Sequence, residues 1–150
     1  MRWPAVAASI AALFAAGCGT DTSGPRPIRT LADMAGTWTL TSWEAVGVAD
    51  TTQRLDLKAQ LTAVATLQVA ADGGATFTSS VYGQSPTVQQ ATISLSGDTL
   101  SYHEITGDSR FLLSGTVNRM ICRGLIPQYQ DVTGDGVPDE TRTRMEFVRN

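Results

Sequence analysis

The chain has 150 residues, a formal net charge of -3 and a charged fraction of 17%. It contains no cluster of basic residues, which argues against nucleic acid as a partner. Thr, Ser, Gly and Val are abundant and lysine occurs once, so the composition is typical of an exported, β-rich domain rather than a helical cytosolic one.

The first 17 residues have the pattern of a secretory signal peptide. Arg2 supplies a positive charge, and the segment 5–16 is apolar except for Ser9 and ends in small residues. This apolar segment is shorter than the roughly 20 residues that a membrane-spanning helix needs. We therefore expect residues 1–17 to be removed from the mature protein, and we leave them out of the fold prediction.

Cys18 follows three small residues, AAG, and this sequence resembles the lipobox of bacterial lipoproteins. The resemblance implies a diacylglycerol on the Cys18 sulfur, an acyl chain such as palmitate on its amino group, and membrane anchoring in the bacterial cell envelope. Several acyl chains on one residue give stable anchoring. Gly19, in place of Asp, fits the rule that sorts such lipoproteins to the outer membrane. The alternative is ordinary cleavage that leaves Cys18 as a thiol or paired with Cys122.

The lipidated cysteine and a flexible tether make up residues 18–30. The segment after Cys18 contains little apolar mass, and Gly24, Pro25 and Pro27 discourage regular structure. Residues 31–150 then form one domain, which is long enough to bury a core of its own.

In this domain, turn residues separate runs that alternate between apolar and polar side chains, the pattern of half-buried strands. In the run 61–70, for example, Leu67 belongs to the apolar face and Gln68 to the polar face. The predicted strands span residues 36–44, 61–70, 75–82, 88–95, 99–105, 110–115, 116–124 and 141–149. An antiparallel meander of about eight strands usually closes to protect its edges, which predicts an all-β, up-and-down barrel. Residues 52–60 fit either a short helix or an extended crossing.

The strand that opens with Gly36-Thr37-Trp38 is similar to the Gly-x-Trp signature of the lipocalin and fatty-acid-binding superfamily. The hairpin rhythm of residues 31–150 resembles that of bacterial lipocalin-like lipoproteins. The resemblance implies a lipocalin-like barrel that binds a small apolar ligand. It also implies a late arginine packed over Trp38, and either Arg144 or Arg149 fits that role.

An eight-stranded barrel either fills itself with side chains or holds one small ligand. Many predicted inward positions carry Ala, Ser or Gly, which leaves room for an apolar ligand against the larger residues Trp43, Leu67, Phe77 and Ile93. The alternative is a filled barrel that acts as a structural module and binds another protein through its rim or the loop 131–140. An enclosed apolar cavity of about 300 Å³ or more would favour the first interpretation.

The segment DVTGDGVPDE, residues 131–140, has part of the spacing of a calcium-binding loop. In that alignment the oxygen ligands come from Asp131, Thr133, Asp135, the Val137 carbonyl and Asp139. Arg142 stands where such a loop has its bidentate carboxylate, so any calcium binding is expected to be weak. The alternative is a polar hairpin tip whose aspartates accept hydrogen bonds from nearby backbone N–H groups. No other cofactor is expected.

We find no catalytic constellation in the sequence. His103 is the only histidine, and it alternates with Glu104 along a predicted strand, so the two side chains point to opposite faces. Neither a zinc site nor a Ser-His-Asp arrangement can be assembled from these residues. We therefore expect that the protein is not an enzyme, and that Cys122 is a small buried hydrophobe when Cys18 is lipidated.

Overall fold

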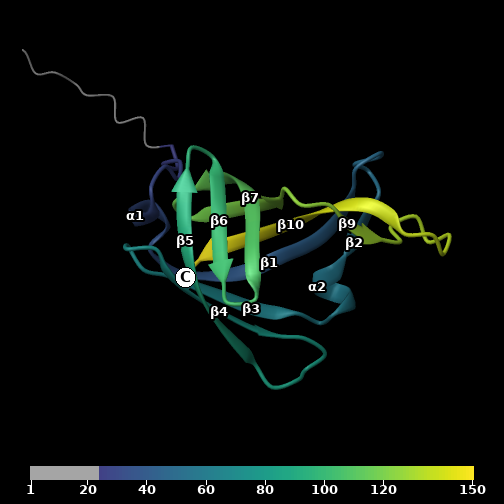
Figure 1. The fold of residues 1–150 in the computed structure, drawn as a ribbon, viewed down its shortest axis with the longest axis horizontal. Coiled ribbons are helices and arrows are strands. Elements are labelled where there is room, and N and C mark those ends of the chain that lie inside the picture. The colour runs from purple at the N-terminus through teal and green to yellow at the C-terminus, as the bar shows by residue number, and fades with distance from the viewer. Residues whose placement is uncertain (1–23) are drawn as a thin grey trace, which may run out of the picture.

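The structure, a computed structural model, describes residues 24–150, so the predicted signal peptide and Cys18 lie outside the described residues. Strands dominate this part of the chain, and the helices are short (Figure 1). The strands are β1 (Gly36–Gly47), β2 (Arg54–Asp56), β3 (Val64–Val69), β4 (Gly74–Ser80), β5 (Thr87–Ser96), β6 (Thr99–Glu104), β7 (Gly107–Thr116), β8 (Arg119–Gly124), β9 (Gln128–Gln130) and β10 (Asp139–Arg149). The helices are α1 (Leu31–Met34) and α2 (Leu57–Gln60).

Eight of these strands close into a barrel. Their hydrogen-bonded order is β1-β3-β4-β5-β6-β7-β8-β10, and β10 pairs back with β1. All neighbouring strands are antiparallel. Each barrel strand therefore has a partner on both sides, which removes the exposed edges of an open sheet. The predicted all-β, up-and-down barrel of about eight strands is confirmed.

Two short strands, β2 and β9, were not predicted. For the segment 52–60 the sequence allows either a short helix or an extended crossing. The structure contains one of each, because the extended strand β2 is followed directly by the helix α2. The switch occurs at Asp56, whose side chain accepts a hydrogen bond from the Ala59 backbone N–H and so caps the helix. Each of these strands has only three residues, too few for an alternating pattern to stand out in the sequence.

The long strands β1 and β10 extend beyond the rest of the barrel. Their antiparallel pairing runs from the pair Trp38–Arg149 at one end to the pair Gly47–Thr141 at the other. At one end β3 and β8 flank this pair, and at the other end β2 and β9 take their places. The chain between β8 and β9 therefore leaves the barrel wall beside β10. A hollow on the outer wall lies at this point.

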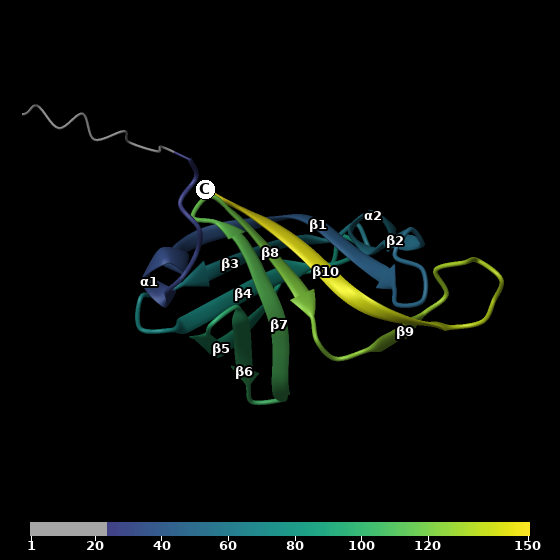
Figure 2. The ribbon, with the colours of Figure 1, turned by 90° about the horizontal axis from the view of Figure 1, so that it is seen from above.

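The amino-terminal part of the described chain lies against one end of the barrel (Figure 2). Thr30 and Asp33 form a capping box that starts α1, with each side chain accepting from the other residue's backbone N–H. Pro27 bridges to Thr116, and the Val117 N–H donates to the Arg26 carbonyl. Arg26 and Pro27, which the sequence analysis assigns to the flexible tether, therefore contact the barrel through paired backbone groups.

The barrel interior is built from the apolar faces of the alternating strands. Leu67 is buried and Gln68 is exposed, as their alternation predicts. The buried hydrophobic cluster consists of Met34, Trp38, Leu40, Ala65, Leu67, Val69, Ala75, Ile93, Leu100, Leu113, Met120, Cys122 and Phe147. The amino-terminal end of the barrel carries α1, whereas the loops 81–86 and 105–106 lie at the opposite end because neighbouring strands alternate in direction.

Candidate functional site

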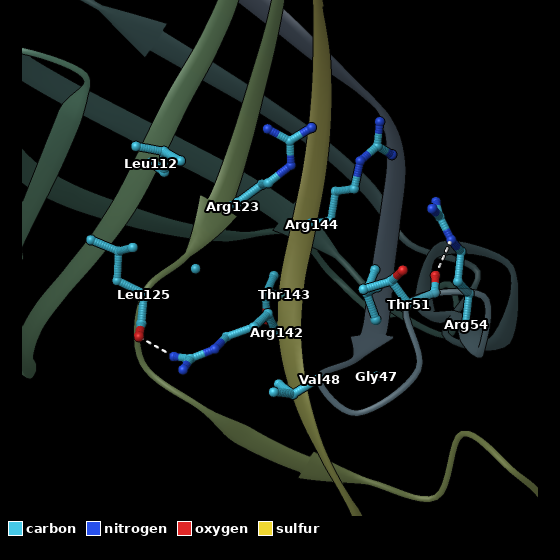
Figure 3. A pocket seen from close by; sticks show the side chains of 12 residues that line it. Gly47, Val48, Thr51, Arg54, Leu112, Arg123, Leu125, Arg142, Thr143 and Arg144 are labelled. Atoms are coloured by element: carbon cyan, nitrogen blue, oxygen red, sulfur yellow. Dashed lines mark hydrogen bonds between the residues drawn. The ribbon is translucent and has the colours of Figure 1, made fainter.

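Trp38 closes the end of the barrel next to α1. Its side chain is fully buried, and its indole N–H donates to the Met34 carbonyl at 2.7 Å. The Arg149 guanidinium lies over the ring, 4.8 Å from the ring centroid. Gly36, at the start of the same strand, has a φ of 137°, which residues with a side chain rarely adopt. Of the two arginines that the resemblance allows, Arg149 packs on Trp38, and Arg144 lies on the outer wall (Figure 3).

Towards the opposite end, the interior contains a cavity of about 160 Å³. Leu67 and Phe77, both predicted as ligand contacts, line it. Ile93, another predicted contact, is buried in the core away from this cavity, and Trp43 packs against the core from a half-buried position. The complete lining is Leu67, Phe77, Gln89, Leu100, Tyr102, Glu104, Ser109, Phe111, Cys122, Met145 and Phe147.

The volume of this cavity decides what the interior can hold. Ligand pockets for drug-sized molecules usually have about 300–1,000 Å³, whereas the interior cavity has about 160 Å³. An apolar cavity of about 150 Å³ can hold a molecule the size of benzene. The interior is therefore filled mainly by the protein's own side chains, with space for one aromatic ring or the end of an alkyl chain.

Three buried polar atoms have no hydrogen-bond partner among the described residues. They are the Tyr102 hydroxyl, the Trp43 indole N–H and the Nε of Arg149. Burial raises the pKa of the Tyr102 phenol to about 12, and the nearby Glu104 carboxylate adds to the rise through its charge and its proximity to the hydroxyl as an acceptor. Burial also raises the pKa of the Cys122 thiol to about 12, so Cys122 is a protonated, unreactive group at neutral pH. Of these three residues, Tyr102 lines the cavity, whereas Trp43 and Arg149 do not.

A larger hollow of about 520 Å³ lies on the outer wall, where the chain leaves β8 beside β10 (Figure 3). We call it the arginine groove. Its lining joins strands β1, β2, β7, β8 and β10 with the loops that follow β1 and β8. The side chains that define it are Arg54, Arg123, Arg142, Arg144, Val46, Val48, Leu112 and Leu125. Among residues 24–150, no carboxylate belongs to the lining.

Two glutamates on the same outer face pair with arginines at the border of the groove. Glu44 lies 3.2 Å from Arg54 and 3.1 Å from Arg144, and Glu146 pairs with both Arg144 and Arg119. Burial by itself raises the pKa of the Glu146 carboxyl, but hydrogen bonds and charge from Arg119 and Arg144 outweigh burial and lower it below its usual value. The carboxylates therefore neutralise one side of the groove.

The sequence analysis does not predict the arginine groove. Its arginines are spread between positions 54 and 144 and form no basic cluster. One signal is present, since Arg142 and Arg144 are two residues apart and must share the outward face of a strand. Their proximity to Arg54 and Arg123 depends on strand register, which the sequence pattern does not specify.

In the loop 131–140, the aspartates accept hydrogen bonds from backbone N–H groups. Asp131 accepts from Gly134 at 2.7 Å and from Gly136 at 2.9 Å, and Asp139 accepts from Thr133. The N–H donors of Gly136 and then Gly134 lower the pKa of the Asp131 carboxyl. Asp135 accepts from the N–H of Val137 at 2.8 Å. Within the described residues, no group of three or more His, Cys, Asp or Glu side chains is arranged to hold a metal ion. This geometry is that of a hairpin tip.

His103 lies on an exposed part of β6. Its Nδ1 is 2.9 Å from the Asp108 carboxylate, directly across the β6–β7 pair. The alternation of side chains along the strand excludes Glu104 as a partner of His103. It gives no sign of Asp108, which the β6–β7 register places opposite His103. The imidazole and the carboxylate are both largely solvent-exposed, and neither lines one of the hollows described above.

Comparison with protein-family models, with curated proteins and with solved structures gave no match for this chain. The fold and the two hollows therefore carry the functional argument. No helix within residues 24–150 has the length and hydropathy to cross a membrane.

Proposed function

We propose that the protein is a lipid-anchored component of the bacterial cell envelope whose lipocalin-like barrel is a filled scaffold and binds its partner on the outer wall. The anchor is Cys18, whose sequence context resembles a lipobox. The outer membrane is the expected destination because Gly19 follows the lipidated cysteine. The Trp38–Arg149 pair adds to the resemblance with the lipocalin superfamily.

The observation that carries this proposal is the contrast between the interior cavity and the arginine groove. The interior cavity has about 160 Å³, which is below the range of about 300–1,000 Å³ for small-molecule sites. The arginine groove has about 520 Å³ and falls within that range. Of the alternatives set by the sequence, the filled barrel is therefore better supported than a barrel with a large internal ligand.

The position of the amino-terminal segment supports the same arrangement. Residues 26–30 contact the barrel at the end that carries α1. The arginine groove includes residues of β1 and β10 at or next to the stretch that β2 and β9 flank, and in Figure 2 the strands β2 and β9 lie away from α1. An anchor attached through this segment leaves the groove accessible from the aqueous side.

A second candidate function is binding of a small apolar molecule inside the barrel. The buried hydroxyl of Tyr102 favours it, because this hydroxyl lies beside the cavity and near the Glu104 carboxylate without completing a hydrogen bond to it, and buried polar groups in proteins are usually hydrogen-bonded. A ligand for this cavity would have about the size of one aromatic ring and would offer one polar atom to Tyr102.

Membrane fractionation of matched cysteine variants tests the anchoring. Cys18→Ser removes the attachment atom, so the variant is expected in the soluble fraction with its signal unprocessed by the lipoprotein route. Cys122→Ala removes the other cysteine, which is buried in the barrel, and is expected to remain in the membrane. Equal membrane association of the Cys18→Ser variant and the unmodified sequence would contradict the proposal.

A further inference from the structure

The arginine groove contains a cross-strand pair of like charges. Arg123 of β8 lies directly opposite Arg144 of β10 in the antiparallel register. Like charges in directly opposite positions destabilise a sheet. Arg144 is balanced by Glu44 and Glu146. Arg123 makes a single side-chain hydrogen bond within residues 24–150, to the Ser114 hydroxyl at 3.4 Å, and so remains an unneutralised cation.

Arg142 adds a second cation at the same place. It lies two residues before Arg144 on the same outward face of β10 and donates a hydrogen bond to the Leu125 carbonyl (Figure 3). Among residues 24–150 it pairs with one carboxylate, that of Glu140 at 3.8 Å, a distance at which an exposed ion pair contributes little. The groove thus concentrates positive charge on a chain whose formal net charge is -3.

Partly exposed aliphatic side chains lie beside these cations. Val48, Leu112 and Leu125 are 43%, 41% and 42% exposed, and all three line the groove. Leu112 is directly opposite Arg123 in the β7–β8 pair, so an apolar and a cationic side chain meet at this position. A molecule that complements the groove therefore needs an anionic head and an apolar body.

We propose that the arginine groove binds an anionic amphiphile, a long-chain fatty-acid anion, with its carboxylate at Arg123 and Arg142 and its alkyl chain along Leu112 and Leu125. The planar guanidinium group presents paired N–H donors that match the two oxygens of a carboxylate. The aliphatic residues cover alkyl groups that water would otherwise surround. This inference rests on the proposed function to the extent that binding takes place on the outer wall.

Nucleic acid complements this surface less well. Recognition of a phosphate backbone needs a stripe of cations, whereas Glu44 and Glu146 interrupt the arginines along the wall. A fatty-acid anion needs one site of positive charge and one apolar strip, which is what Arg123, Arg142 and Leu112 provide.

The test is a titration of residues 24–150, which contain the whole barrel and its core, with dodecanoate below its micelle concentration. Methyl signals of Val48, Leu112 and Leu125 are expected to shift in NMR spectra. Arg123→Gln is expected to weaken binding about tenfold because it removes a charged hydrogen-bond donor. Arg29→Gln is the matched control, since it removes the same charge from an exposed residue beside α1, and binding is expected to be unchanged.

Three further ligands separate the parts of the proposal. Dodecyl phosphate has another oxyanion head and is expected to bind at the same residues, whereas dodecanol and acetate are each expected to bind much more weakly. If dodecanol binds as tightly as dodecanoate, the anionic head is not needed, and the inference is overturned. If acetate binds as tightly as dodecanoate, the alkyl chain is not needed, and the inference is overturned as well. Absence of any dodecanoate shift would overturn the inference and leave the proposed function standing. Shifts at Leu67 and Leu100 in place of the groove would overturn both.

Discussion

The guanidinium group of Arg149, near the end of β10, lies 4.8 Å from the centroid of the Trp38 ring near the start of β1. The same arginine donates a hydrogen bond to the carbonyl of Asp33, which lies within α1. One side chain therefore joins the two strands that close the barrel and the helix beside them. This contact fastens the closed end of the barrel.

Replacement of Arg149 by Met is expected to lower the free energy of unfolding by about 1–3 kcal/mol, because it removes the cation–π contact and the bond to α1. Chemical denaturation with the Trp fluorescence of the barrel as readout measures this. Arg29→Met, at an exposed position, is the control and is expected to change the free energy by no more than about 0.5 kcal/mol. Equal losses in the two variants would show that the contact contributes nothing.

Leu67 and Gln68 test the two faces of β3. Leu67→Asp is expected to unfold the barrel, because it puts an unpaired charge into the core and so costs several kcal/mol. Gln68→Asp, at the exposed neighbouring position, is expected to leave the melting temperature almost unchanged. Thermal unfolding followed by circular dichroism compares them. Similar midpoints for the two variants would mean that the inside and outside of the strand are assigned wrongly.

Glu146 predicts a pH dependence of stability. Its pKa is lowered in the folded protein: burial opposes the shift, and the hydrogen bonds and charges of Arg119 and Arg144 outweigh burial. A carboxyl group with a lowered folded-state pKa stabilises the fold above its unfolded-state pKa, and this contribution is lost as the pH falls through the folded-state value. Glu146→Gln is therefore expected to destabilise the protein at pH 7 by about 1–3 kcal/mol.

The difference between Glu146→Gln and the unmodified protein should shrink once the pH falls below about 4. Denaturation curves across this pH range measure the difference. The matched control is Glu140→Gln, because Glu140 is more exposed and lies 3.8 Å from its arginine. A destabilisation by Glu146→Gln that is the same at pH 7 and at low pH would contradict the ionic origin of the effect.

The loop 131–140 is expected to show no calcium-specific stabilisation. Its aspartates accept backbone hydrogen bonds, and Arg142, which stands where a calcium loop has its closing carboxylate, instead bonds the Leu125 carbonyl. Melting temperatures with calcium or with magnesium should therefore agree, because screening treats both ions alike. A rise of several degrees with calcium alone, abolished in Asp135→Asn, would make the loop a metal site.

Much of the barrel can be predicted from the sequence because half-buried strands alternate with period two and turn residues separate them. The features that matter for function nevertheless depend less on pattern than on register. Leu67 and Phe77 are predictable as inward residues, but the cavity volume depends on how closely the strands across the barrel approach. Trp43 fits the inward pattern only after the irregularity in β1 between Leu40 and Ser42, which shifts the register.

The arginine groove shows the same limit more clearly. Arg142 and Arg144 share a face by their spacing alone, whereas their neighbours Arg54 and Arg123 reach them through β2 and β8. The first of these strands has three residues and no alternating signal. A surface site assembled from single residues on separate strands leaves no motif in the sequence.

The central claim is that the barrel interior is filled and that binding takes place on the outer wall. Native mass spectrometry of the protein purified from its host in mild detergent tests this claim, with Ser109→Phe and Arg123→Gln as matched variants. Ser109 lines the interior cavity and Arg123 lines the arginine groove, so Ser109→Phe fills the cavity and Arg123→Gln weakens binding in the groove. The account predicts that any retained small molecule is kept at an unchanged level in Ser109→Phe and at a clearly lower level in Arg123→Gln. A retained apolar molecule that persists in Arg123→Gln and disappears in Ser109→Phe would contradict it.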